Sequence, residues 1–271
     1  MSLTIQKANV TDIKPTLGTP SLGFVHDAIA GGTAYKIGAD GYFVVAAQQH
    51  PFLPQFVVDV RLPELPNLSS FKWVALQMLK NSGGMLYIDS SNSDAFALAW
   101  RLQLQLLPAS PLLQYSPKAA KFSTAVDVVR EASPDDNQYV GKLLNATARQ
   151  RGGLAQADLM QFVQQKQAYV LENRGRSAGA AVVVPQGSSY AWLEAFALDP
   201  SVQRSPVSYT VFEKLALKLQ EQKRSLIFGM SHLNAGEYVG SMKLGATMIG
   251  QSYHAFLPTA CADFKLAPAY T

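Results

Sequence analysis

A strand, a polar loop and a helix start follow one another at residues 190–219, an order that is able to bind a phosphate-bearing ligand. Residues 190–198 are rich in apolar and aromatic side chains, which predicts a strand. The chain breaks at Asp199-Pro200 and enters a helix at Ser205-Pro206, where serine caps the first turn and proline loses no hydrogen bond. Because N–H groups at a helix N-terminus attract anions, the loop before this helix is a candidate binding site. The alternative is a well-capped helix without a ligand.

Two titratable side chains close to this stretch are candidates for moving a proton. Glu194 is the only carboxylate within the predicted strand, and its neighbours Trp192, Leu193 and Phe196 would desolvate it. Desolvation raises the pKa of a carboxyl group and would suit a general base. The alternative is an exposed strand residue paired with a cation. His232 follows the next predicted strand and is either a base or substrate contact, or a solvated loop histidine.

The composition argues against several classes of partner. The 271 residues carry a formal charge of +4 and the basic residues occur in ones and twos, so we expect no nucleic acid partner. The single cysteine, Cys261, leaves no internal disulfide, and no spacing typical of metal ligands is present. No apolar run reaches the roughly 20 residues that span a bilayer, and the N-terminus lacks the order of a signal peptide. We therefore expect a cytoplasmic protein without a membrane partner.

Periodicity predicts an alternation of strands and helices in both halves of the chain. In the first half we expect irregular structure over most of residues 9–31, strands at 3–8, 33–37, 42–47, 56–62, 85–88 and 112–115, and helices at 69–80 and 93–107. In the second half we expect strands at 125–131, 168–172, 178–184, 190–198, 226–229 and 248–257, and helices at about 134–149, 155–165, 206–219 and 234–243. The fold class is therefore α/β.

The two halves repeat one order of elements. Strand, helix, strand, polar turn, helix and strand occur at residues 56–115 and again at 190–257. Aligning Asn92 with Asn234 brings a short apolar strand of one half onto that of the other. A period this long indicates two copies of one domain, the alternative being a coincidence between two α/β patterns.

The element order over residues 122–258 resembles the GNAT (Gcn5-related N-acetyltransferase) superfamily. Residues 128–136, VVREASPDD, are similar to the first strand and helix start of that family. The resemblance implies an α/β (α+β) fold with two mixed β-sheets flanked by helices. The first half looks like a truncated copy without the first two helices. With the segment 116–122 as the linker, we expect a degenerate GNAT-like domain at 1–118 and a GNAT acyltransferase domain at 122–271.

The acyl-CoA loop of the family is matched in part. Leu198-Asp199-Pro200 takes the place of its V-x-P step, and Gln203 falls in register with the Q/R of its Q/R-x-x-G-x-G/A loop. Pro206 and Ser208 stand where that loop has glycine, so one N–H donor is lost and a side chain is added. The resemblance implies acetyl-CoA, or another acyl-CoA, as co-substrate. The implied contacts are Ala197, Leu198, Gln203, Arg204, Ser205, Ser208 and Asn234.

The resemblance also implies a general acid on the helix after Asn234. Ser241 stands where the family has the tyrosine that protonates the leaving thiolate, and serine is a poorer acid. Tyr238, one turn earlier, is the substitute candidate; its alternative is a residue at the edge of the core. Glu194 and His232 would then serve as the base, and the acceptor would be an amine of a small molecule or peptide.

Two rival functions remain open. Tandem GNAT-like domains with few glycines in this loop also resemble the FemABX-type aminoacyl transferases, which use charged tRNA as donor. The missing glycines and tyrosine equally fit a non-catalytic GNAT-fold binding module. An open groove between the two parallel strands would count against the latter.

Overall fold

The protein divides into two compact units. The computed structural model describes residues 4–14, 19–45, 57–63, 68–81, 86–89, 93–117, 128–147, 156–202, 207–229 and 241–256. The first unit comprises Met1–Leu112, Ser231–Leu233 and Met248–Lys265, and the second comprises Leu113–Met230, Asn234–Thr247 and Leu266–Thr271. The domains expected from the sequence place the closing strand wholly in the second half, whereas most of this strand is counted here with the first unit.

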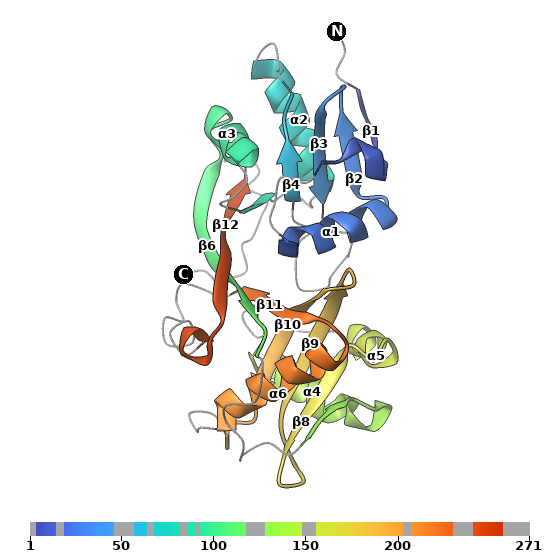
Figure 1. The fold of residues 1–271 in the computed structure, drawn as a ribbon, viewed down its shortest axis with the longest axis vertical. Coiled ribbons are helices and arrows are strands. Elements are labelled where there is room, and N and C mark those ends of the chain that lie inside the picture. The colour runs from blue at the N-terminus through green and yellow to red at the C-terminus, as the bar shows by residue number, and fades with distance from the viewer. Residues whose placement is uncertain are drawn as a thin grey trace. The chain divides into compact units, whose positions relative to one another are not determined.

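The first unit contains a four-stranded antiparallel sheet in the order β1-β2-β3-β4 (Figure 1). These strands are β1 (Ile5–Lys7), β2 (Ala34–Ile37), β3 (Gly41–Val45) and β4 (Val57–Arg61). A further strand, β5 (Leu86–Asp89), pairs antiparallel with residues 252–255 of β12 (Thr247–Phe256). The predicted hairpin and the two strands that follow it are confirmed.

Three helices accompany this sheet: α1 (Thr19–Ala30), α2 (Leu68–Asn81) and α3 (Ser93–Arg101). Apolar residues of α2 recur at helical spacing and form one buried face with the sheet, and the members of this face are Phe71, Val74, Ala75 and Met78. The face packs with Phe43 and Val45 of β3 and with Leu98 of α3. The Arg101 guanidinium lies 4.8 Å from the centre of the Phe71 ring, which links α3 to α2.

The expectation of irregular structure before residue 31 is wrong, because helix α1 occupies residues 19–30. Pro20 lies in the first turn of the helix, where its missing N–H costs nothing. Val25 and Ala28, three residues apart, are 1% and 0% exposed. Burial of this short apolar face outweighs the density of Gly, Pro and Thr in the preceding sequence.

The predicted helix over residues 93–107 ends early. In the structure α3 ends at Arg101, and the N–H of Leu104 donates to the carbonyl of Ala99, with Gln103 at a φ of 52°. This left-handed residue closes the helix in the manner usually taken by glycine. The chain then extends as β6 (Gln105–Tyr115), which is much longer than the strand predicted at 112–115.

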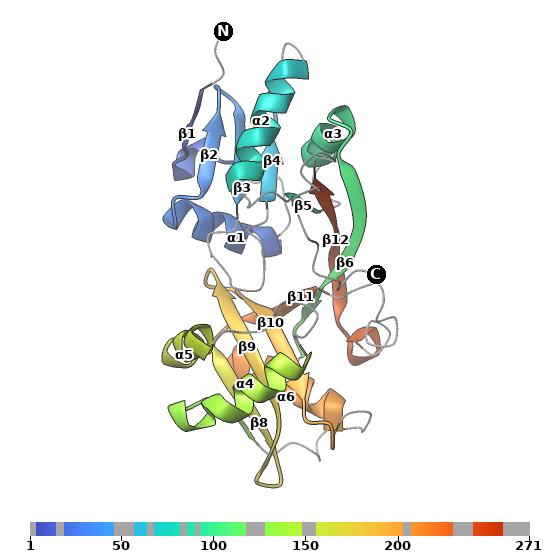
Figure 2. The same ribbon diagram turned by 180° about the vertical axis from the view of Figure 1, so that it is seen from behind.

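The sheet of the second unit runs in the order β6-β11-β10-β9-β8-β7, and β6 is counted in this unit from Leu113 on. Those not yet placed are β7 (Val128–Glu131), β8 (Ala168–Asn173), β9 (Arg176–Gln186), β10 (Tyr190–Leu198) and β11 (Ser225–Gly229). The sheet is antiparallel from β7 to β10, and β10 and β11 are parallel. Its helices are α4 (Asn137–Thr147), α5 (Gln156–Gln164) and α6 (Val207–Glu221), with α4 and α6 on opposite faces (Figures 1 and 2).

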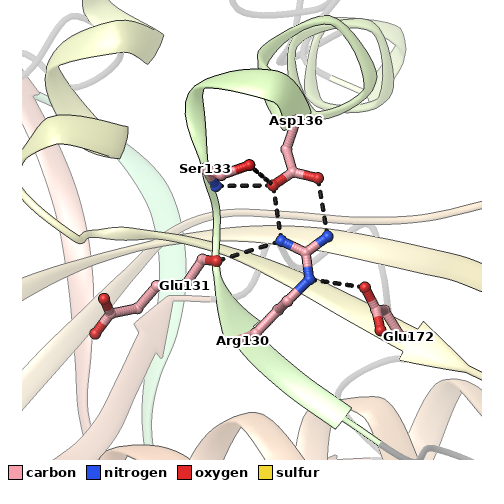
Figure 3. A network of polar contacts seen from close by, with 5 residues as sticks. All are labelled: Arg130, Glu131, Ser133, Asp136 and Glu172. Carbon is pink, nitrogen blue, oxygen red and sulfur yellow. Dashed lines mark hydrogen bonds and ion pairs between the residues drawn. The ribbon is translucent and has the colours of Figure 1, made fainter. Parts of the chain in front are cut away.

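Arg130 ties together the first strand, its neighbour and the first helix of the second unit (Figure 3). Its Nη1 and Nη2 donate to the two oxygens of Asp136 at 2.7 and 2.9 Å, and its Nε donates to Oε1 of Glu172 at 2.7 Å. Asp136 also accepts from the N–H and hydroxyl of Ser133, both at 2.7 Å. The Arg130 hydrogen bonds, together with those from Ser133, hold the pKa of Asp136 well below its usual value.

We expect Asp136→Asn to lower the free energy of unfolding at pH 7 by about 2 kcal/mol, because it removes hydrogen bonds between charged groups at a half-exposed site. Since the folded pKa of Asp136 is depressed, its contribution is present above the unfolded pKa of about 3.9 and is lost as the pH falls below it. Urea unfolding measured from pH 7 down to pH 3 tests both points. The variant should lose less stability over this range than the unaltered protein.

Asp12→Asn provides a matched comparison in the first unit. The Asp12 carboxylate accepts from the N–H of Asn9 at 2.9 Å and pairs with Lys36 at 2.7 Å, but it faces no arginine. We therefore expect a smaller loss of stability than for Asp136→Asn. Equal losses would contradict the special role of the Arg130 pair.

The two units begin in the same way, which supports an internal repeat. In each, a buried alanine after the first strand donates its N–H to an alanine of the next strand: Ala8 to Ala34 at 2.9 Å and Ala132 to Ala168 at 2.8 Å. In each, a 3-10 turn follows. One helix in the first unit, and two in the second, then lead to three antiparallel strands, another helix and a further strand. The expectation that the first half lacks the first two helices is wrong for one of them, because α1 lies between β1 and β2.

Candidate functional site

Strand β10 carries a bulge at Glu194. Leu193 pairs with Val183 of β9 and Ala195 pairs with Val182, so Glu194 is an extra residue on β10. On its other side, the pairing of β10 with β11 among the described residues covers Tyr190–Trp192, just before the bulge, although β10 continues to residue 198. The bulge therefore falls where the main-chain pairing of the two parallel strands ends.

Beyond the bulge, the main-chain N–H groups of β10 alternately point toward β9 and away from it. The N–H of Asp199 donates to the carbonyl of Ala178 on β9 at 2.9 Å. Because alternate residues of an antiparallel strand face alternate neighbours, the N–H groups of Phe196 and Leu198 point away from β9. They are directed toward the side on which β11 pairs with the first part of β10. The carboxyl end of β10 thus presents main-chain donors at the start of the loop that leads to α6.

Glu194 is 7% exposed, so it is a buried carboxylate rather than one on an open strand face. Because Glu194 is the extra residue of the bulge, it interrupts the regular alternation of side chains between the two faces of the strand. Ala197, on the β9 side of the same segment, is 2% exposed, and its carbonyl oxygen lies 2.9 Å from where a Cβ on Gly179 would be. Glycine at 179 therefore allows β9 to approach β10 closely at this point.

The first unit has a counterpart of this strand. Val45 pairs with Val57 and Val44 with Asp59, so Val58 is the extra residue of β4, as Glu194 is of β10. Counting from the bulge, Leu62 corresponds to Leu198. The N–H of Leu62 donates to Oδ2 of Asp94, in the first turn of α3, at 3.0 Å. In this unit a carboxylate of the chain itself thus occupies the equivalent donor, and an aliphatic side chain replaces the glutamate.

An aromatic cluster fixes α6 against the sheet beside the candidate site. The Phe212 ring of α6 meets Phe196 of β10 edge to face at 5.9 Å and Phe228 of β11 at 5.0 Å. It also stacks on Tyr115 of β6 at 5.5 Å. Burial, followed by the nearby charge of Glu213, raises the pKa of Tyr115 to about 12, so the phenol stays protonated. The cluster sets the position of α6 relative to β10.

The turn after β10 is closed by Asp199. Its Oδ1 accepts from the N–H of Ser201 at 2.9 Å and from the Ser201 hydroxyl at 2.6 Å, which lowers the pKa of Asp199. The hydroxyl of Tyr139, on α4, is buried without a hydrogen-bond partner among the described residues. Burial and the Asp199 charge raise the pKa of Tyr139 to about 12. Sequence reasoning missed Tyr139, since nothing in the spacing of α4 indicates its position near the end of β10.

Only part of the predicted site lies within the described residues. Glu194, Ala197 and Leu198 come together on β10 around the bulge and the end of the strand. Ser208 is the second residue of α6, and Ser241 is half-buried in the helical turn before β12. The other predicted residues lie outside the described ranges, and they are Gln203, Arg204, Ser205, His232, Asn234 and Tyr238. Their place relative to Glu194 stays a prediction.

Within the described ranges no three His, Cys, Asp or Glu side chains are grouped as a metal ion would require. Nor does any helix among these residues have the length and apolar character needed to cross a bilayer.

The fold has counterparts among solved structures, although no protein-family model and no curated protein matches the chain. A GNAT-family acetyltransferase from Colwellia psychrerythraea matches 95% of this chain and 100% of its own, with a TM-score of 0.61 and 13% identity. A GCN5-related N-acetyltransferase from Sphaerobacter thermophilus matches 92% of this chain and 96% of its own, with a TM-score of 0.58 and 10% identity. A tandem GNAT protein from the clavulanic acid biosynthesis pathway matches 94% of this chain and 98% of its own, with a TM-score of 0.56 and 12% identity. The chain therefore has the GNAT fold, over nearly its whole length.

Proposed function

We propose that this protein is an acyl-CoA-dependent N-acyltransferase that transfers an acyl group, most simply acetyl, to an amine of a small molecule or peptide. The observation that carries the proposal is the bulged strand β10. Its pairing with β11 ends at Trp192, and the N–H groups of Phe196 and Leu198 point away from β9. Strands with this geometry in a GNAT fold suit a thioester laid along the backbone. Two of the solved structures with this fold are described as acetyltransferases, which supports the same reaction class.

The residues of the chain would divide the chemistry as follows. Acetyl-CoA would supply the activated acyl group. The N–H of Leu198 would donate to the thioester carbonyl and stabilise the oxyanion that develops there. Glu194 would accept the proton lost by the amine as its nitrogen bonds to the carbonyl carbon. As the C–S bond breaks, the thiolate would take a proton from Tyr238, or from water held by Ser241.

The helix N-terminus completes the proposed site. Arg204, Ser205 and Ser208 would hold the phosphates of the cofactor in place of the glycine-rich loop, together with the dipole of α6. Gln203 and Asn234 would contact the rest of the cofactor, and His232 is a second candidate for the base. These assignments follow the sequence and await the experiments below.

We assign the activity to the second unit alone. In the first unit Leu62 corresponds to Leu198, but its N–H is already bound to the Asp94 carboxylate. A carboxylate at this place satisfies the donor and would repel the carbonyl oxygen of a thioester. Val58 stands in place of Glu194 and cannot accept a proton. We therefore expect one acyl-CoA molecule for each chain, with the first unit as a degenerate copy.

Isothermal titration of the full chain with acetyl-CoA tests the proposal. We expect saturable binding at one molecule per chain, followed by release of free CoA when amines are added. A panel of polyamines, aminoglycosides and peptides with free N-termini surveys the acceptor. Absence of binding at millimolar acetyl-CoA would remove the proposed function, and two sites per chain would remove the assignment to one unit.

Matched proline variants test the role of the backbone donor. Leu198→Pro removes the N–H proposed to hold the thioester carbonyl, and we expect a fall in kcat of about a hundredfold or more. Leu198→Ala keeps the N–H and should retain most of the activity. Leu62→Pro makes the equivalent change in the first unit and should leave turnover within about threefold. Circular dichroism and thermal unfolding establish that each variant is folded, and equal losses at 62 and 198 would contradict the assignment.

A second candidate function is a non-catalytic binding module with the same fold. It is favoured by Ser241, which stands where the family has its acid tyrosine. In this candidate the cofactor site is lost, so it predicts neither saturable acetyl-CoA binding nor CoA release for any amine in the panel. Release of CoA at a rate that depends on amine concentration would exclude it.

A further inference from the structure

A pocket lies on the second unit, at the C-terminal end of α6. Its volume is about 210 Å³, and its walls come from β7, β8, β9, β10 and the ends of α5 and α6. The polar part of its lining includes Glu131, Lys166, Tyr169, Gln222 and Arg224. Helix α6 has 15 residues, so this pocket is roughly 22 Å from the helix N-terminus where the acyl-CoA loop is proposed. It is therefore a separate site, and the proposal below does not depend on acyl-CoA binding.

The charges in the pocket are not balanced. Glu131 pairs with Lys166 at 3.6 Å, and the Lys166 side chain is 74% exposed. Arg224 is half-buried, and within the part of the chain that the structure describes it has no carboxylate partner. Its Nη1 donates one long hydrogen bond of 3.4 Å to Gln222, and its Nε is shielded from water and has no hydrogen-bond partner among the described residues. A partly desolvated guanidinium of this kind favours an anion.

The rest of the pocket lining includes an apolar wall. Val183, Ala191 and Leu219 line it and are 3%, 1% and 1% exposed, and Pro185 adjoins them. The Tyr169 ring, 3% exposed, continues this surface, and its hydroxyl is hydrogen-bonded to Gln222. An inorganic anion would leave this wall uncovered. A ligand with an anionic head and a short hydrocarbon tail would satisfy both sides.

We propose that this pocket binds a small aliphatic carboxylate, with its carboxylate group on the Arg224 guanidinium and its tail against Val183, Ala191 and Leu219. Pockets for drug-sized ligands measure about 300–1,000 Å³, so a volume of about 210 Å³ limits the ligand to a few carbon atoms. Arginine binds a carboxylate through two parallel hydrogen bonds, which a lysine cannot reproduce. The chemistry is shared by short fatty acids and by small amino acids, whose ammonium group would face Glu131.

Ligand-observed NMR titration of the full chain tests the proposal, with acetate, butyrate, 2-aminobutyrate and inorganic phosphate as probes at constant ionic strength. We expect saturable binding of butyrate in the millimolar range and about tenfold weaker binding of acetate, because two methylene groups fewer are buried. Tighter binding of 2-aminobutyrate than of butyrate would identify the amino acid as the source, and the reverse order the fatty acid. Equal affinity for phosphate and butyrate, or no saturation by about 100 mM, would overturn the proposal.

Variants locate the binding. Arg224→Gln should weaken butyrate binding at least tenfold, and Arg176→Gln, which removes the same charge from an exposed position on β9, should leave it within twofold. Equal weakening by the two variants would show a general charge effect and overturn the assignment. Thermal unfolding establishes that Arg224→Gln is folded. If it is not, Arg224→Lys serves instead: it keeps the charge and should weaken binding several-fold, and unchanged affinity would count against the guanidinium.

Discussion

Replacing Glu194 with glutamine is expected to lower kcat for acyl transfer by at least about a hundredfold while changing the affinity for acetyl-CoA less than about threefold. The side chain is buried in the bulge of β10, beside the main-chain donors that we assign to the thioester. Glutamine keeps its size and burial but accepts no proton. General-base catalysis contributes about 10²–10⁴ to enzymatic rates, which sets the expected loss. Steady-state kinetics with the best amine of the panel, combined with titration of acetyl-CoA, measures both quantities.

The pH dependence of kcat/KM distinguishes a catalytic role of Glu194 from a purely structural one. If Glu194 is the base, kcat/KM of the unaltered protein should fall toward acidic pH as the carboxylate is protonated, and this acidic limb should be absent from the residual activity of Glu194→Gln. Glu221→Gln is the control, since Glu221 is 67% exposed at the end of α6, where it pairs with Lys218. Its profile should match that of the unaltered protein. A Glu194→Gln variant with full activity would leave His232 or water as the base.

Local sequence signals predicted the fold where the chain is regular. The apolar run Tyr190–Leu198 matches β10 at both ends, because turn residues flank it and every position fits a buried strand. The helix start at Ser205-Pro206 gave the beginning of α6 in the same way, since α6 opens at Val207. Helix α1 was missed because Gly, Pro and Thr are dense in this part of the sequence, whereas the burial seen at Val25 and Ala28 comes from tertiary contacts.

The features that define the candidate site depend on contacts between segments distant in sequence. The bulge at Glu194 is a property of the register between β9 and β10, and no pattern within β10 alone specifies it. The hydrogen bond from Leu62 to Asp94 joins residues 32 apart, so the occupied donor of the first unit is visible only in three dimensions. The internal repeat was predicted from element order. The shared bulge and the shared alanine hydrogen bonds support it at the level of single residues.

Gly179 links the packing of the sheet to the geometry of the proposed site. It pairs with Leu198 across β9 and β10. A Cβ at this position would lie 2.9 Å from the carbonyl oxygen of Ala197 and 3.2 Å from the side chains of Leu171 and Leu198. The first of these contacts is with the backbone, so β9 and β10 would have to move apart by a few tenths of an ångström. That movement falls on the segment that carries the N–H of Leu198.

Gly179→Ala is therefore expected to lower the free energy of unfolding by about 1–3 kcal/mol, the usual cost of overpacking, and to lower kcat by about tenfold through displacement of the Leu198 donor. Ser177→Ala, two residues earlier at an exposed position of β9, should change neither quantity measurably. Urea unfolding and acetyl-transfer kinetics on the same preparations give the two effects together. Loss of stability with unchanged kcat would mean that the carbonyl of the thioester does not rest on this part of β10, because a catalytic donor at Leu198 cannot shift without cost to the transition state.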